Sequence, residues 1–276
     1  MRVCVTGASG KAGRAIVAEL LASGYDVTAV DLQAPRSPLD VPVMQADLVE
    51  YGQAVEALAG ADAVVHMANI PAPGLYTPAV IFQRNSVMNA NVFFAAALHK
   101  LKRVVWASSE TTLGLDFTEP PKYAPLDEDH YPYPTTTYSL SKVVSETAAT
   151  HVAAWSGIPF VALRISNIME PHDYARFPSF QNNVRLRKWN LWSYVDARDV
   201  ALAARLGLEA DVVGASSYIV AAADTVMDRP SADLMAEVFP DVRLTHELKG
   251  RESLMSIDKA RRVLGYEPKF SWEDLV

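Results

Sequence analysis

The sequence predicts an α/β protein whose core is a doubly wound parallel sheet, extended by a small C-terminal lobe. Two observations indicate this fold. Short apolar runs recur along the first 168 residues, and longer segments with helical periodicity separate them. The apolar runs show no polar alternation, which is typical of strands that helices cover on both faces of a parallel sheet.

Each element follows from a local pattern. A glycine turn separates the first strand from a helix with Ile16, Val17 and Leu20 on its apolar side, and Gly24 ends that helix. Pro159 precedes the last buried run. We expect strands at 3–6, 26–30, 41–45, 63–66, 103–107 and 160–165. We expect further helices at 49–58, 79–98, 138–154 and 196–208, and then, from residue 214 onward, two helical patterns and short strands.

The composition indicates a sizeable core and little attraction for polyanions. Of the 276 residues, 50% are hydrophobic and 21% are charged, and the formal net charge is -7. This charge argues against nucleic acid or an anionic membrane as the main partner. Cys4 is the only cysteine, so no internal disulfide is expected and a reducing compartment is favoured. A strand is predicted near Met1 and no apolar run reaches the ~18 residues of a membrane span, so we expect a cytoplasmic protein.

The turn after the first strand has the spacing of a phosphate-binding loop. Gly7, Gly10 and Gly13 are spaced by three, between a strand and a helix. The first glycine permits the tight turn, the second lets the backbone approach a pyrophosphate, and the third lets the helix pack closely on the strand. The helix start offers N–H groups to the phosphates. This context predicts a Rossmann-type dinucleotide site with contacts from Gly7, Ser9, Gly10, Lys11, Ala12 and Gly13.

Asp31 predicts which dinucleotide is bound. It ends the second strand, 18 residues beyond Gly13, where a carboxylate accepts hydrogen bonds from the adenosine ribose. A carboxylate there repels a 2′-phosphate, so NAD is favoured, although Lys11, Arg14 and Arg36 keep NADP open. Asp31 is alternatively an ordinary strand-end residue. Further cofactor contacts are expected near the strand ends, at Leu32, Asp47, Leu48, Met67, Ala68, Asn69, Ala107, Ser108 and Ile165, with the loop of Pro71, Pro73 and Gly74 bordering the nicotinamide or substrate.

Tyr138 and Lys142 form a candidate acid/base pair. They are four residues apart, which places them on one face of a helix. A nearby ammonium stabilises a phenolate, so Tyr138 could take a proton from a substrate hydroxyl. Ser108 and Ser109 end the strand at 103–107, where a hydroxyl can hold the reacting oxygen against Tyr138. A turn or helix-cap serine is the alternative interpretation.

In this order the motifs resemble those of the extended short-chain dehydrogenase/reductase family, the NAD-dependent epimerase/dehydratase group. The likeness extends over nearly the whole chain. It implies that Tyr138 is the acid/base, that Lys142 tunes it and binds the ribose, and that Ser109 rather than Ser108 is the catalytic hydroxyl. Asn85 would be a relay or structural residue near the cofactor, or simply a surface asparagine. The matching segments are 6–13, Asp31, 85–92, 108–114, 138–142, 164–171, 194–201 and 258–268.

The tail is shorter than in family members that act on nucleotide-linked sugars, so we expect a smaller substrate. The chain also resembles the uronate dehydrogenase branch, and Arg176 would then bind a carboxylate through two hydrogen bonds. Glu110 and Thr111 depart from the asparagine and histidine expected after the serines. The expected domains are a cofactor domain, 1–168 with 194–213, and a substrate lobe, 169–193 with 214–276. The expected substrate contacts are Ser109, Glu110, Asn167 and Arg176, and no metal is expected.

Three further features of the sequence each allow two interpretations. Arg185, Arg187 and Lys188 either attract an acidic substrate or, as we favour, form a solvated face. The loop at 115–137 is either a lid or a packed surface loop. The resemblance implies a homodimer through helices near 79–98 and 138–155, whose alanines suit a helix interface or packing against the sheet equally well. Trp189, Trp192 and Tyr194 are expected in the core or an interface.

Three functions are compatible with these residues. The first is an NAD-dependent oxidoreductase acting on a sugar, sugar acid or similar polyol through Ser109, Tyr138 and Lys142. The second is an NAD-dependent epimerase or dehydratase that retains its cofactor. The third is a non-catalytic NAD(P)-sensing protein, against which the intact acid/base pair argues. In each case the expected partner is a small, carbohydrate-like molecule.

Overall fold

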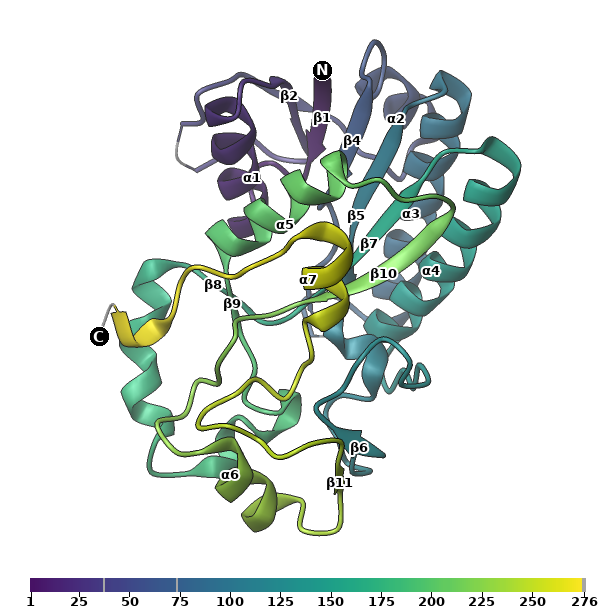
Figure 1. Cartoon of the computed structure of the whole chain (residues 1–276). Helices are drawn as coiled ribbons and strands as arrows, with labels where there is room; N and C mark the ends of the chain where they lie inside the picture. Colours follow the sequence, from purple (N-terminus) through teal and green to yellow (C-terminus); the bar gives the residue numbers. More distant parts are fainter. Residues whose placement is uncertain (37, 73, 275–276) are drawn as a thin grey trace.

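A seven-stranded parallel sheet forms the centre of the protein, as Figure 1 shows for the computed structural model, which describes residues 1–36, 38–72 and 74–274. The strand order is β10-β7-β5-β4-β1-β2-β3. The order reverses between β1 and β4, and ligands of such sheets bind beyond the strand ends at this switch point. The doubly wound parallel sheet is confirmed. Its strands are β1 (Arg2–Thr6), β2 (Asp26–Asp31), β3 (Val43–Gln45), β4 (Ala63–His66), β5 (Arg103–Ser109), β7 (Phe160–Ile165) and β10 (Ala215–Val220).

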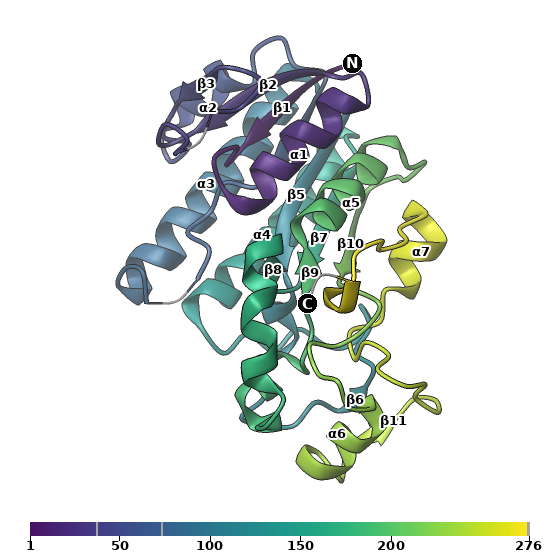
Figure 2. The same cartoon turned by 90° about the vertical axis from the view of Figure 1, so that its left-hand side faces the viewer.

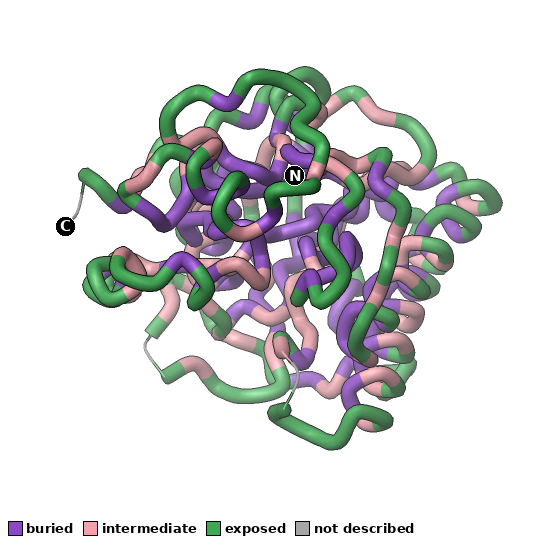
Figure 3. Tube along the Cα trace, turned by 90° about the horizontal axis from the view of Figure 1, so that it is seen from below, coloured by how far each residue is buried: buried purple, intermediate pink, exposed green. Residues whose placement is uncertain are grey.

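Helices cover both faces of this sheet. On one face α1 (Lys11–Ala22) and α5 (Ala197–Glu209) lie side by side (Figure 2). The other face carries α2 (Tyr51–Ala57), α3 (Pro78–His99) and α4 (Thr137–Ser156). There the Phe93 ring of α3 packs edge to face against the rings of Trp106 and Phe160 from the sheet. Seen from below, the buried positions lie in the middle of the molecule, and exposed positions follow the outer helices (Figure 3).

Local sequence signals set the ends of α4, the helix that carries the candidate acid/base pair. Thr136 and Ser139 cap its start reciprocally, each side chain accepting from the other's backbone N–H. Gly157 ends the helix in the left-handed region, at a φ of 73°. Tyr138 and Lys142 therefore lie in the first two turns, directly beyond the carboxyl end of β5.

Two boundaries differ from the sequence prediction. The short strand at Ala215–Val220 was assigned to the small lobe, but as β10 it pairs with β7 along its length and forms the edge of the main sheet. The helix α7 (Asp258–Leu264) packs against β10 and α5, so it also belongs to the sheet's cover. The sequence did not place β10 in the main sheet because only half of its residues are buried. It therefore lacks the continuous apolar run by which the other strands are recognised.

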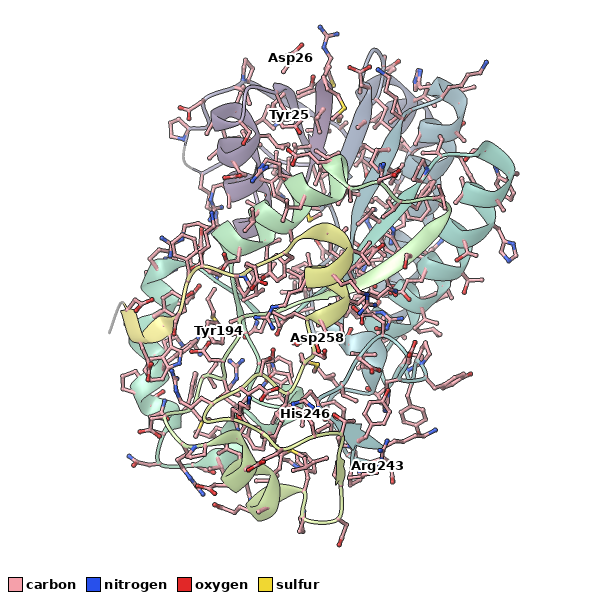
Figure 4. All side chains as sticks on the ribbon, in the orientation of Figure 1. Tyr25, Asp26, Tyr194, Arg243, His246 and Asp258 are labelled. Carbon is pink, nitrogen blue, oxygen red and sulfur yellow. The ribbon has the colours of Figure 1, made fainter. Side chains whose placement is uncertain are left out.

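The remaining segments build a lobe below the sheet in Figure 1, largely from short elements. Its core is aromatic: Phe177 packs against the rings of Tyr174, Tyr194 and Trp272. The hydroxyl of Tyr194, labelled in Figure 4, donates to Asp224. Tyr194 and Trp192 are thus core residues, whereas Trp189 is partly exposed. The regular elements are β6 (Tyr123–Ala124), β8 (Ile168–Met169), β9 (Val195–Asp196), α6 (Ser231–Val238), β11 (Arg243–Leu244) and the 3-10 helices η1 (Glu110–Leu113), η2 (Pro171–Phe180), η3 (Val184–Leu186), η4 (Lys188–Asn190) and η5 (Trp272–Asp274).

The loop at 115–137 is anchored rather than open over its first half. Phe117 and Leu126 are buried, and β6 pairs with β11 from the tail. Tyr131 and Tyr133 near its end are exposed. Pro73, and the last two residues of the predicted lobe, lie outside the described residues. In the described part of the chain, no helix combines the length and the apolar character that crossing a bilayer requires.

Candidate active site

The glycine turn has room for phosphates only because side chains are missing from it. Gly7 has a φ of 68°, and a Cβ there would lie 2.5 Å from the Ala68 backbone nitrogen. A Cβ on Gly13 would overlap the carbonyl oxygen of Gly7. Gly10 is the N-cap of α1 and provides no side-chain acceptor, so the first N–H groups of the helix have no side-chain cap. These features fit a dinucleotide pyrophosphate.

Asp31 and the turn are tied together. One carboxylate oxygen of Asp31 accepts from the Ser9 backbone N–H at 2.9 Å, and the other accepts from the Gln33 backbone N–H at 3.3 Å. The side chain is partly exposed at the end of β2, and Leu32 and Arg36 beside it are exposed. Asp31 is thus held next to the phosphate turn, where its charge can act on the ribose end of a dinucleotide.

The two basic residues of the turn already have carboxylate partners. Lys11 forms an ion pair with Asp173, and Arg14 pairs with Glu170 at 2.6 Å. Both partners belong to the segment that enters the small lobe. Neither charge is available without breaking an ion pair. Arg36, the third residue that kept NADP open, is exposed. Glu170, His172 and Asp173 also come close enough together to share a cation, but the first and last hold Arg14 and Lys11.

Two predicted cofactor residues have structural partners. Asp47 receives two hydrogen bonds from the Arg84 guanidinium, at 2.9 and 3.1 Å. The buried amide of Asn85 donates to the carbonyl of Ile70 and accepts from its N–H, at 3.1 and 2.8 Å. The alternative of a surface asparagine at position 85 is wrong, because the side chain is fully buried. Asn85 instead holds the loop that follows β4, where Met67, Ala68 and Asn69 lie.

A buried polar chain beside this loop was missed by the sequence analysis. The His66 ring bonds the Thr6 hydroxyl at 2.6 Å and the Asn89 side chain at 2.9 Å, and Asn89 donates to Ser145 on α4 at 2.8 Å. Burial lowers the pKa of His66 to about 3, so the ring stays neutral. A histidine at the end of an otherwise apolar strand was the signal that could have revealed it.

The structure brings Ser109, Tyr138 and Lys142 together at the carboxyl end of β5, all of them buried. The Lys142 ammonium lies 5.5 Å from the centre of the Tyr138 ring and donates to the Ala107 carbonyl at 2.7 Å. The Ser109 hydroxyl accepts from the N–H and the hydroxyl of Thr111. Burial raises the pKa of Tyr138, and a hydrogen bond with Ser109 partly opposes that rise. A phenol, a hydroxyl and an ammonium therefore face one buried site.

Ser108 takes the other direction. Its hydroxyl donates at 2.5 Å to Glu146, which also receives two hydrogen bonds from Arg164. Neighbouring residues of a strand point to opposite faces, so only one of the two serines can face Tyr138. This geometry agrees with Ser109 as the reacting serine. The Ser108 side chain, predicted to contact the cofactor, is instead engaged with Glu146.

Burial dominates the protonation of the pair. It raises the pKa of Tyr138 to about 12 and lowers that of Lys142 to about 7, against the opposing effect of Glu146 on the lysine. The lowering of the phenol pKa by Lys142 stays a prediction, because burial sets the direction of the shift in the chain alone. At neutral pH Tyr138 is therefore protonated, and it accepts a substrate proton only as the phenolate.

The side chains expected to bind substrate differ in how far they are buried. Glu110, the first residue of η1, is buried, and its carboxylate accepts from Asn190 at 3.2 Å. Burial raises the pKa of Glu110 to about 7. Asn167 is partly buried, and its backbone carbonyl accepts from Val195. Arg176 is exposed on η2.

The solvated face predicted at 185–188 is partly wrong. Arg185 is exposed as expected, but Arg187 is buried and lies over the rings of Phe180 and Trp189, 5.3 and 5.2 Å from their centres. The aromatic rings replace water around the guanidinium. The spacing of charges along the sequence does not reveal such partners, because they come from both sides of the basic cluster.

Together, a phosphate turn on a Rossmann sheet and a buried serine, tyrosine and lysine beyond β5 define the class of nicotinamide-dinucleotide-dependent oxidoreductases. The sequence matches the profile of the NAD dependent epimerase/dehydratase family over residues 3–221. The chain belongs to this family, and it is an NAD-dependent enzyme.

Relatives of known activity agree with the family. The chain is 26% identical to an NAD-dependent glucose-6-phosphate dehydrogenase of Haloferax volcanii, across 97% of this chain and 92% of that protein. It is 28% identical to a uronate dehydrogenase of Pseudomonas putida, across 68% and 66% of the two chains. Such relatives are dehydrogenases, reductases and epimerases, so the hypothesis of a non-catalytic sensor finds no support among them.

Solved structures agree in fold. A short-chain dehydrogenase/reductase of Agrobacterium tumefaciens with bound NAD superposes with a TM-score of 0.78 at 20% identity, covering 100% of this chain and 94% of that one. A UDP-glucose 4-epimerase of Thermotoga maritima, with UDP-glucose, gives a TM-score of 0.76 at 20% identity, covering 100% and 96%. At this identity the likeness extends to the fold alone.

Proposed function

We propose that the protein oxidises a sugar, sugar acid or similar polyol at a carbinol carbon, with NAD as the electron acceptor. The observation that carries the proposal is the convergence of Ser109, Tyr138 and Lys142 at one buried point beside the phosphate turn. Full-length similarity to a glucose-6-phosphate dehydrogenase supports a carbohydrate substrate and net oxidation. That this chain has the same kind of activity is part of the proposal.

Each residue of the trio has a separate task. NAD, when bound, supplies an acceptor for the hydride that leaves the substrate carbon. Tyr138 takes the proton of the substrate hydroxyl, and Ser109 holds the same oxygen by a hydrogen bond. Lys142 is positioned by the Ala107 carbonyl, and its charge favours the phenolate that must form.

The cofactor residues are proposed from the same geometry. The turn from Gly7 to Gly13 would hold the pyrophosphate, and Asp31 would accept from the adenosine ribose. Met67, Ala68 and Asn69 would border the nicotinamide half, on the loop that Asn85 holds. Leu32, Leu48 and Ile165 remain proposed contacts at the strand ends.

The test is direct. Purified protein is mixed with NAD and a panel comprising glucose 6-phosphate, glucuronate, galacturonate, free sugars and polyols, and NADH is followed by absorbance. We expect NADH to form with one compound class, and we expect Tyr138→Phe to abolish it. Tyr131→Phe serves as the matched control, since that phenol is exposed in the preceding loop. NAD binding without NADH formation across the panel would contradict the proposal.

A retained-cofactor epimerase or dehydratase is the second candidate, because the chain is also 28% identical to a UDP-glucose 4-epimerase of Lacticaseibacillus casei, over 61% of its length. This function requires that hydride return to the substrate. It would convert a nucleotide sugar to an isomer or dehydrated product with no net NADH. Product analysis by chromatography in the same assay separates the two functions.

We further propose a cytoplasmic homodimer that forms through α3 and α4. Of the alanines on these helices, which suited either a helix interface or the sheet, Ala95, Ala96, Ala149 and Ala153 are buried toward the sheet. Larger side chains are exposed instead, and the rings of Phe94 and Trp155 stack across the two helices with their centres 6.4 Å apart. The exposed apolar residues on these helices are Val87, Phe94, Leu98, Leu140, Val144 and Trp155. Sedimentation should give a dimer for the unmodified protein and a monomer for Trp155→Glu; a monomer for both would contradict the interface.

A further inference from the structure

Three buried polar side chains next to the catalytic trio have unmet hydrogen-bonding capacity. Glu110, Arg187 and Asn190 are 3%, 7% and 0% exposed. Among the described residues, no group meets the geometry of a hydrogen bond to one carboxylate oxygen of Glu110, the Nε of Arg187 or the Oδ1 of Asn190. The Ser166 hydroxyl and the Asn167 N–H lie near enough to lower the pKa of Glu110, against the larger effect of burial. A buried polar atom without a partner destabilises the folded protein, because it has lost its hydrogen bonds to water. Three of them in one place therefore point to a ligand that completes them.

The three residues do not satisfy one another in the way of a structural ion pair. Arg187 donates to the Ser193 carbonyl at 3.0 Å and lies between aromatic rings, while its Nε is left over. Asn190 uses its amide nitrogen to bridge Glu110 and the same Ser193 carbonyl, at 3.2 and 2.8 Å. The charges of Glu110 and Arg187 influence each other, yet no hydrogen bond joins them. Two acceptors and one donor thus remain.

This cluster adjoins the reacting atoms. Glu110 directly follows Ser109, and its charge acts on the Tyr138 phenol. An ionised carboxylate or phosphate only accepts hydrogen bonds, so it would leave the Glu110 and Asn190 oxygens without a donor. A hydroxyl can donate to the Glu110 or Asn190 oxygen and accept from the Arg187 Nε at the same time.

We propose that Glu110, Arg187 and Asn190 form a specificity subsite that binds the hydroxyl on the carbon next to the one that is oxidised. The substrate would then be a polyhydroxy compound that is neutral at its reacting end. Any anionic group of the substrate would lie away from the reacting end. This inference rests on the proposed function and names the substrate feature that the site selects.

The experiment measures binding separately from turnover. The protein is saturated with NADH, and tryptophan fluorescence is titrated with glucose, glucose 6-phosphate and glucuronate, because Trp189 stacks on Arg187 and reports on the subsite. For oxidation at carbon 1 the neighbouring hydroxyl is the one on carbon 2, so the 2-deoxy forms of the first two sugars are compared with their 4-deoxy forms. On the unmodified protein we expect loss of the hydroxyl next to the oxidised carbon to weaken binding by about tenfold or more, and loss of the distant hydroxyl to change it less.

Variants then assign the effect to the cluster. Glu110→Ala and Arg187→Met should each weaken binding of the parent sugar about tenfold and remove the difference between the parent and its 2-deoxy form. Glu119→Ala and Arg185→Met, both in exposed neighbouring positions, should leave that difference unchanged. Glu110→Gln keeps the side-chain size. If the larger changes prevent folding, the difference in binding between the parent sugar and its 2-deoxy form is measured on this variant instead.

The outcomes distinguish the subsite from the proposed function. If the 2-deoxy sugar binds as tightly as its parent, or if no sugar of the panel binds, the subsite proposal is overturned. Sugar binding with the expected discrimination but no NADH formation would support the subsite and contradict net oxidation. NADH formation with no discrimination at the neighbouring hydroxyl would support net oxidation and contradict the subsite.

Discussion

The cofactor side and the substrate side of this protein are organised by different parts of the chain. The shape of the phosphate turn depends on backbone groups and on the absence of side chains. A Cβ at Gly7 or Gly13 would collide with the main chain. Around Glu110 and Arg187, buried charged side chains from segments far apart in sequence are held by aromatic rings and single hydrogen bonds. Under the proposed function, the first side would hold the cofactor, and the second side would bind the substrate through a few side chains.

The trio lies at the junction of these regions, and its removal gives the largest expected effect. Lys142→Met should lower kcat by about 10²-fold, since the ammonium that favours the phenolate is lost from a buried site. Lys122→Met, at an exposed position, is the control. Steady-state kinetics with the productive sugar measure the change. Turnover within a few-fold of the unmodified protein would remove Lys142 from the mechanism.

Adding one methyl group to the phosphate turn should destabilise the protein. Gly13→Ala should cost about 1–3 kcal/mol of unfolding free energy, because the new Cβ overlaps the Gly7 carbonyl and forces α1 away from β1. Gly52→Ala in α2, where a Cβ meets no atom within 4 Å, should instead stabilise the protein by about 0.5–1 kcal/mol. Denaturant titration measures both. Equal effects would mean that the turn is not tightly packed.

Cofactor choice should depend on one carboxylate. Asp31→Ala should weaken NAD about tenfold and relax the discrimination against NADP, because it removes both the ribose acceptor and a repulsive charge. Asp40→Ala changes an exposed carboxylate of the following segment and should do neither. Isothermal titration with each dinucleotide checks this. Tighter binding of NADP than NAD by the unmodified protein would contradict the role of Asp31.

The smallest expected effect is a shift in pH dependence. Burial holds the pKa of Tyr138 at about 12 in the chain alone, and oxidation needs the phenolate. The kcat/KM for oxidation should therefore rise with pH through the neutral and alkaline range, whereas reduction, which uses the protonated phenol, should stay flat. Lys142→Met should move the rising limb up by about one pH unit. An unmoved limb would mean that Lys142 does not tune the phenol even with the cofactor bound.

The difference between the regions also explains what the sequence could predict. Glycine spacing, buried strands and a four-residue Tyr–Lys interval are local, so the sequence predicted six strands of the sheet, the glycine turn and the residues of the trio. The choice of Ser109 over Ser108 came from family resemblance, and strand alternation accounts for it. Arg187 was misjudged because its burial depends on rings at positions 180 and 189 and on Glu110, which only the fold brings together. β10 was misplaced because its half-exposed residues resemble a loop.

The measurement that tests the central claim most directly is the amount of NADH formed per protein molecule with free NAD in excess and the sugar panel as substrate. Net oxidation through the trio predicts many NADH molecules per protein with the productive sugar, and none with Tyr138→Phe. At most one NADH per protein, with the sugar returned as an isomer, would contradict it and identify an enzyme that keeps its cofactor and gives the hydride back.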